Sequence, residues 1–62
     1  MKVYIIFYSN KYDWEEQGIE EVFNSRKKAI EYLEQELKTK NRPHGVWEEE
    51  YYRYYIEEYD VK

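Results

Sequence analysis

The segment that decides the fold is residues 25–38, which read SRKKAIEYLEQELK. Its apolar residues recur at steps of three and four positions and so share one face of an α-helix: Ala29, Ile30, Leu33 and Leu37. Ser25 is suited to cap the first turn, because its hydroxyl can accept a hydrogen bond from a free backbone amide two or three residues later. The pattern predicts an amphipathic helix that starts at Arg26 and ends near Lys38 to Lys40, before a proline and a glycine.

The helix opens with three basic residues, Arg26, Lys27 and Lys28. Peptide dipoles already leave partial positive charge at this end of a helix, so acidic residues would be more favourable there. Two interpretations stay open. The charges are solvated and pair with carboxylates such as Glu31, or they form a docking point for an anion or for a partner's carboxylate. The three residues are therefore candidate anion-binding residues.

Residues 2–8 form a run of β-branched and aromatic side chains that predicts the central strand of a sheet. Val3, Ile5 and Phe7 fall on one face of this strand, and Tyr4, Ile6 and Tyr8 fall on the other. The pattern does not choose which face the helix covers. Because one helix can cover only one face, the second face, which carries tyrosine, indicates a partner or a second copy of the chain.

The remaining segments complete a small α+β domain. Ser9 to Gly18 is expected to form a loop, in which Trp14 either folds back over the sheet as a lid or stands out as an anchor for a partner. Ile19 to Phe23 is expected to be a second strand, with Ile19, Glu21 and Phe23 on one side. Thr39 to Gly45 is expected to be a basic loop.

The C-terminal segment predicts one long strand from about Glu50 or Tyr51 to Val61, with Trp47 to Glu49 as an irregular lead-in. We therefore expect a three-stranded antiparallel-type sheet of β-β-α-β connectivity and strand order 2-1-3, with one helix on one face. Residues 1–62 are expected to form a single α+β domain.

The composition argues against several chemistries. Without cysteine, the chain has no disulfide framework or thiolate zinc site, and no segment resembles a signal peptide or a membrane span. His44 is the single histidine and lies between proline and glycine, which favours a solvated loop residue. Consecutive glutamates at 48–50 point in different directions and do not predict a metal site. We expect a cytoplasmic protein, in the host cell, that is not an enzyme and has no catalytic residue, metal or cofactor.

Nine tyrosines and two tryptophans favour an interaction protein. Such side chains combine a large contact area with a polar tip. The expected partner contacts are Trp14, Trp47, Tyr51, Tyr52 and Tyr54, with Glu48, Glu49 and Glu50 steering the encounter. A chain this short buries little surface by itself, so we also expect a homodimer.

Several short stretches of the sequence carry a resemblance to known proteins: VYIIFY at 3–8, Gly18-Ile19 and Val22 to Ser25 before the helix, Lys28-Ala29 and Tyr32-Leu33 within it, and YIEEYDV at 55–61. The chain resembles small uncharacterised proteins of bacteriophages, prophages and Gram-positive bacteria. It departs from them in the basic turn 26–28, where similar proteins are acidic, and in the insert 47–52. The resemblance implies a phage-type accessory or regulatory protein that binds something, and it implies no enzyme. We therefore expect a phage or prophage factor that binds and modulates a host protein, by inhibition, with a defence or nucleic-acid-processing factor as the target.

Charge patterning leaves two alternatives. One acidic cluster comprises Glu15, Glu16, Glu20 and Glu21, and a second comprises Glu48 to Glu50, Glu57, Glu58 and Asp60, in a chain of net charge -4. If the strands that carry them are neighbours, the carboxylates could imitate the phosphates of DNA and occupy a DNA-binding protein. Alternatively, the tyrosines with Arg26 to Lys28, Lys40 and Arg42 could bind nucleic acid directly. Both compete with the simpler explanation that these charges keep the protein soluble.

Overall fold

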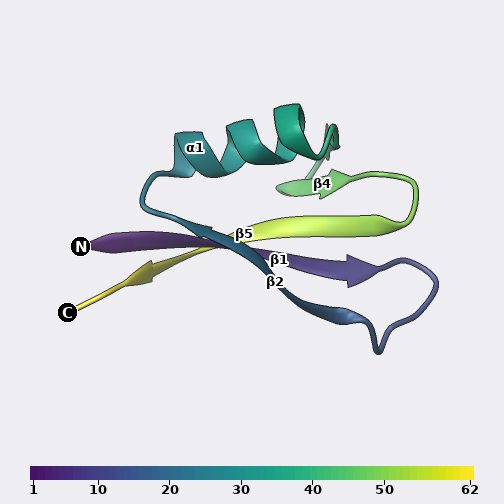
Figure 1. Cartoon of the computed structure of the whole chain (residues 1–62), viewed down its shortest axis with the longest axis horizontal. Coiled ribbons are helices and arrows are strands. Elements are labelled where there is room, and N and C mark those ends of the chain that lie inside the picture. Colours follow the sequence, from purple (N-terminus) through teal and green to yellow (C-terminus); the bar gives the residue numbers. More distant parts are fainter.

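The computed structural model describes residues 1–62 and shows an antiparallel sheet with a helix along one side (Figure 1). The elements are β1 (Lys2–Asn10), β2 (Gln17–Phe23), α1 (Arg26–Glu31) with its π-helical continuation η1 (Tyr32–Glu36), β3 (Lys40–Arg42), β4 (Val46–Glu48) and β5 (Tyr52–Asp60). The sheet has five strands in the order β2-β1-β5-β4-β3. The α+β class is therefore confirmed, but the prediction of a three-stranded sheet is wrong.

The two additional strands form a hairpin between the helix and β5. Lys40 pairs with Glu48 and Arg42 pairs with Val46, so the expected basic loop and the expected irregular lead-in pair with each other. Each strand has only three residues, which is too short for alternation of polar and apolar residues to reveal it. β4 then pairs with β5 through Trp47 and Tyr54, and this pairing joins the hairpin to the sheet.

The turn of this hairpin depends on left-handed backbone at His44, with φ of 69°, and at Gly45, with φ of 71°. A Cβ atom at Gly45 would meet no other atom within 4 Å, so only the backbone conformation opposes a side chain there. We expect Gly45→Ala to lower the free energy of unfolding by about 1 kcal/mol, because a left-handed conformation disfavours residues with a Cβ atom. Urea unfolding followed by circular dichroism measures this loss.

His44→Asn is the matched control for that substitution, since asparagine tolerates the left-handed region better than most residues. It should unfold at the same urea concentration as the unmodified chain or at a slightly higher one. Equal midpoints for Gly45→Ala and the unmodified chain would show that the turn carries no such constraint.

The helix begins where the sequence predicts and ends earlier. Ser25 is the N-cap, and its Oγ accepts a hydrogen bond from the backbone amide of Lys28 at 3.3 Å. Beyond Glu31 the helix widens, because the Leu37 amide donates to the Tyr32 carbonyl at 3.1 Å, five residues back. Lys38 then adopts a left-handed φ of 55°, which stops the helix at Glu36.

Thr39 caps the C-terminal end of this helix. Its amide and its Oγ1 both donate to the carbonyl of Leu33, at 3.0 and 2.7 Å. Thr39 is the single polar residue among the buried ones, and its hydroxyl is satisfied by that bond. Local hydrogen bonds of Thr39 therefore end the helix, before the proline and glycine that the sequence analysis had assigned to this role.

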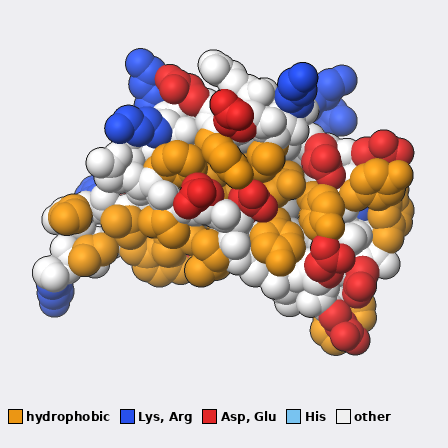
Figure 2. Space-filling view, viewed as in Figure 1, with side chains coloured by type: hydrophobic (Ala, Val, Ile, Leu, Met, Phe, Trp, Pro, Cys, Tyr) orange, Lys and Arg blue, Asp and Glu red, His pale blue; other side chains and the backbone are white.

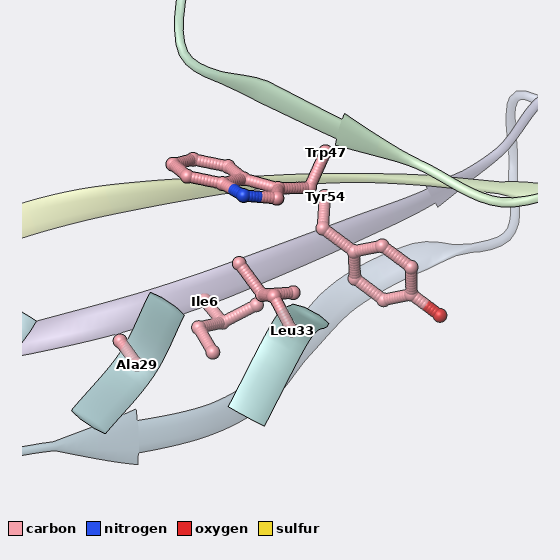
Figure 3. Close-up of a cluster of buried hydrophobic side chains, with 5 residues drawn as sticks. All are labelled: Ile6, Ala29, Leu33, Trp47 and Tyr54. Atoms are coloured by element: carbon pink, nitrogen blue, oxygen red, sulfur yellow. The ribbon is translucent and has the colours of Figure 1, made fainter. Parts of the chain in front are cut away.

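The hydrophobic core lies between the helix and the sheet (Figure 3). It consists of five buried side chains, contributed by β1, the helix, β4 and β5: Ile6, Ala29, Leu33, Trp47 and Tyr54. Tyr4 and Tyr8 pack against this core from the same face of β1 as Ile6. The helix therefore covers the tyrosine-bearing face of β1, and the face left without a covering element is the one that carries Val3, Ile5 and Phe7.

A bulge in β2 changes which of its side chains share a face. Phe7 pairs with Ile19 and Ile6 pairs with Glu21, so Glu20 is an extra residue between these pairs. The prediction that Ile19 and Phe23 share a face is therefore wrong. Phe23 turns toward the helix and packs on Tyr32 with ring centroids 5.4 Å apart, whereas Ile19 and Val22 lie on the other face.

No helix in the structure has the length and apolar character needed to cross a membrane.

Candidate functional site

Two loops meet at one end of the sheet. β1 and β5 pair antiparallel along their whole length, from Lys2 with Asp60 to Asn10 with Tyr52. The loop between β1 and β2 (residues 11–16) therefore lies beside the loop between β4 and β5 (residues 49–51), at the right in Figure 1. The Lys11 amide donates to the Tyr51 carbonyl at 2.8 Å and joins the two loops directly.

These loops expose three large aromatic side chains, which we call the aromatic tip: Tyr12, Trp14 and Tyr51. Their exposed fractions are 78% for Tyr12, 79% for Trp14 and 53% for Tyr51. Tyr12 and Tyr51 contact each other edge to face, with ring centroids 6.3 Å apart. Trp14 does not fold back over the sheet, so the prediction of a lid is wrong and the alternative of an outward anchor describes its position.

Hydrogen bonds between residues that are close in sequence order the backbone of the first loop. The Asn10 side chain accepts from the Tyr12 amide at 2.8 Å, and the Asp13 side chain accepts from the Glu15 amide at 3.1 Å. The Glu16 amide donates to the Asp13 carbonyl at 3.0 Å, which closes a turn around Trp14. The aromatic side chains thus stand on a loop whose backbone is already fixed.

The second loop is ordered in the same way. The side chain of Glu49 accepts from the Tyr51 amide at 3.0 Å, while its own amide donates to the Tyr52 carbonyl at 3.0 Å. The Tyr52 hydroxyl donates to Glu16 across the two loops, and this hydrogen bond to a carboxylate, followed by burial, raises the pKa of Tyr52. Tyr52 therefore links the two loops that carry the aromatic tip.

Five carboxylates surround the aromatic tip and form an acidic rim: Asp13, Glu15, Glu16, Glu49 and Glu50. Figure 2 shows acidic side chains gathered around hydrophobic ones at this end of the molecule. Exposed aromatic groups within a negative field suit a partner that offers an apolar pocket with a basic border.

The structure brings together most of the residues that the sequence indicates as partner contacts. Trp14, Glu49, Glu50, Tyr51 and Tyr52 all lie in or beside the two loops.

Two of the predicted aromatic contacts are buried, since Trp47 is 2% exposed and Tyr54 is 6% exposed. Both belong to the core, and the indole Nε1 of Trp47 donates to Glu34 at 3.0 Å. Their side chains are therefore not available to a surface partner. Tyr12, which the sequence analysis did not single out, takes a place at the aromatic tip. Its position in a polar loop two residues from Trp14 is the signal that could have found it.

Unlike the carboxylates of the two loops, Glu48 lies in β4 and is surrounded by basic side chains. Its carboxylate forms ion pairs with Lys11 at 3.6 Å, Arg42 at 3.4 Å and Arg53 at 3.3 Å. Partial burial alone would raise the pKa of Glu48, but the three cations outweigh burial and lower it. Glu48 is thus neutralised by its neighbours and contributes little to steering a partner.

A shallow depression of about 360 Å³ adjoins this cluster. It is lined entirely by charged residues: Lys11, Lys38, Lys40, Arg42, Glu48, Glu49 and Glu50. Pockets for small organic ligands are mostly apolar, which this depression is not. No group of three or more histidine, aspartate or glutamate side chains converges in a way that could hold a metal ion.

The basic residues Arg26, Lys27 and Lys28 are exposed in the first turn of α1 and form no ion pair. The Lys28 amide is already bound to Ser25, so one of the free amides that an anion would need is occupied. Their role in anion binding stays a prediction.

No family model, no curated protein and no solved structure matches the chain.

Proposed function

We propose that this chain is a non-enzymatic accessory protein of phage or prophage type, which binds and modulates a host protein through the aromatic tip. The observation that carries the proposal is the exposure of Trp14 and Tyr12, at 79% and 78%, on loops with a hydrogen-bonded backbone. The resemblance of the sequence to small phage and prophage proteins supports the biological setting.

Physical chemistry favours this surface as a binding site. Tryptophan and tyrosine dominate the energetic centres of protein interfaces, where they fill apolar pockets and exclude water. Loops that are ordered before binding lose less conformational freedom when the partner arrives, so more of the contact energy appears as affinity. At the aromatic tip, the hydrogen bonds of Asn10, Asp13 and Glu49 provide that order.

The acidic rim defines the chemistry of the partner. Its carboxylates attract a basic surface at long range, which increases the rate of association. Proteins that bind or process nucleic acids carry such surfaces. We therefore propose a host defence or nucleic-acid-processing factor as the target, and inhibition as the result of binding.

Imitation of DNA is the weaker alternative, because it requires the acidic strands to be neighbours. Glu20 and Glu21 lie on β2, whereas Glu57, Glu58 and Asp60 lie on β5, and β1 separates these two strands. The remaining carboxylates of the two clusters lie in the loops at one end of the sheet and in β4. In addition, Tyr32 donates a hydrogen bond to Glu20 at 2.9 Å, and Glu48 is paired with three cations. The acidic groups therefore do not form one continuous track.

Capture from a bacterial lysate by the immobilised chain, with mass spectrometry of the bound proteins, tests the proposal. The double variant Tyr12→Ala and Trp14→Ala should lose the captured partner, and each single variant should weaken the binding of that purified partner by roughly 10- to 100-fold. Gln35→Ala is the control, because Gln35 is exposed on the helix, away from the two loops.

Equal recovery of the same partner by the double variant and the unmodified chain would refute the role of the aromatic tip. Replacing Glu15 and Glu50 by glutamine tests long-range attraction separately from direct contact, because neither carboxylate takes part in a hydrogen bond or an ion pair within the chain. These changes should slow association and reduce its dependence on salt, while dissociation stays nearly unchanged.

A further inference from the structure

The face of the sheet opposite the helix has no covering element in the fold (Figure 1). We call it the open face, and its apolar residues come from three adjacent strands: Val3, Ile5, Phe7, Ile19, Val22, Tyr55 and Tyr59. Ile19 is 57% exposed, Val22 47%, Tyr59 44% and Tyr55 41%. A contiguous apolar surface of this kind on a soluble protein marks an interaction site.

The apolar part of the open face is comparable to a small protein interface. β1 and β5 have nine residues and extend for about 30 Å, and the three strands that carry the apolar residues span about 15 Å with their side chains, which gives roughly 450 Å² in projection. The corrugated surface of the side chains exceeds this projected area. Two copies together therefore bury an area toward the lower end of specific interfaces, which is about 1,200 Å² in total.

Charges on β5 indicate which partner fits. Side chains alternate along a strand, and Tyr54 faces the core, so Arg53, Tyr55 and Glu57 follow one another on the open face. Arg53 and Glu57 are thus placed symmetrically about Tyr55. Glu57 has no cation of its own chain within ion-pair distance, whereas Arg53 shares Glu48 with two other cations.

This order of charges is complementary to itself when one strand is reversed. If a second copy lies face to face with its strands antiparallel, and a two-fold axis passes by Tyr55, Arg53 of each copy lies over Glu57 of the other. A parallel arrangement would instead place like charges over each other. Phe7 stacks on Tyr55 with ring centroids 5.3 Å apart and provides a flat aromatic centre for the contact.

We propose that the open face is the interface of a homodimer, in which two sheets pack face to face with antiparallel strands around Tyr55. Such a two-fold interface uses the same surface of both copies, so each contact between two different residues occurs twice. The dimer buries the apolar open face and pairs Arg53 with Glu57 twice. It leaves the two aromatic tips free and places them at opposite ends of the assembly.

Sedimentation equilibrium over a range of protein concentrations tests this proposal. The unmodified chain should show twice its monomer mass of 7.9 kDa. Glu57→Arg should weaken dimerisation at least tenfold, because it places arginine against Arg53 of the second copy. The double variant Arg53→Glu and Glu57→Arg should restore the dimer, since the exchanged charges are again complementary; Lys11 and Arg42 still neutralise Glu48 in that variant.

Circular dichroism of each variant checks that the fold is retained, and both exchanged side chains are exposed enough to permit this. A monomer mass at every concentration would overturn the proposal. It would also be overturned if Glu57→Arg dimerised as well as the unmodified chain, or if the exchanged double variant associated no better than Glu57→Arg. None of these variants alters the aromatic tip, so failure here is distinguishable from failure of host-protein binding.

Discussion

Trp47→Ala should remove a large part of the free energy of unfolding. The Trp47 side chain is 2% exposed and packs in a core of only five residues. Removing a buried tryptophan typically costs about 3–5 kcal/mol, whereas a chain of this size has a total stability of about 3–9 kcal/mol. Loss of its hydrogen bond to Glu34 adds to the effect. Far-ultraviolet circular dichroism and urea unfolding measure the result.

Trp14→Ala is the matched control for this experiment, because it removes the same side chain from a position that is 79% exposed. It should change the free energy of unfolding by less than about 0.5 kcal/mol. Trp47→Phe should fall between these two variants, since it keeps an aromatic ring in the core but removes the indole donor. A stable Trp47→Ala variant would contradict the position of β4 in the sheet.

The second large effect is expected in alkaline solution. Burial, with smaller contributions from Glu49 and Glu20, raises the pKa of Tyr54 to about 12. Burial, followed by the hydrogen bond to Glu20, also raises the pKa of Tyr32 to about 12. In the unfolded chain, tyrosine titrates near pH 10. The folded state therefore holds both phenols in their neutral form beyond the pH at which the unfolded chain would ionise them.

The direction of the pH effect on stability follows from the difference between the tyrosine pKa values of the folded and unfolded states. Stability from these tyrosines is fully present below about pH 10 and is lost as the pH rises toward 12, because the unfolded chain releases its protons first. Tyr54 should contribute to this loss, because its side chain is 6% exposed and packs in the core. Urea unfolding at a series of pH values between 8 and 12 should show a steep decline.

Tyr54→Phe isolates the contribution of the buried phenol. The Tyr54 hydroxyl takes part in no hydrogen bond within the chain, so the variant should be about as stable as the unmodified protein near pH 7. Between pH 10 and 12 its stability should fall less steeply. Parallel declines for the two proteins would mean that Tyr54 is not buried as a neutral group.

The elements that could be predicted from the sequence are those with strong local signals. Ser25 caps the helix through its own side chain, and the apolar spacing of Ala29 and Leu33 places both in the core. The run at residues 3–8 lies in β1, which has β2 on one side and β5 on the other. In each case, local chemistry and the final packing favour the same conformation.

The errors arose where the structure depends on distant contacts. The three residues of β4 have little strand signal, and their pairing with β5 is what buries Trp47. The bulge at Glu20 shifts the register by a single residue, which brings Ile19 onto the open face beside Val22. A one-residue shift reverses the face of every side chain beyond it, and sequence alternation cannot reveal such a shift.

The candidate site was accessible to sequence analysis only in part, for a related reason. Trp14 and Tyr51 are polar-loop aromatics, but their proximity depends on the register of β1 with β5. Trp47 and Tyr54 belong to residue types that occur both in cores and in interfaces. Whether an aromatic side chain lies in a core or on a surface depends on the pairing of the strands, which composition does not specify.

The pairing of β1 with β5 also has a consequence for how the chain folds during its synthesis. Nearly the whole sequence separates the partners Val3 and Tyr59, and the Val61 amide donates to the Met1 carbonyl at 2.7 Å. Contacts between such distant residues form slowly, because a long loop must close before they contribute. During synthesis, residues 3–8 therefore emerge long before residues 52–60, and the edge of β1 that faces β5 has no partner strand until residues 52–60 have been added.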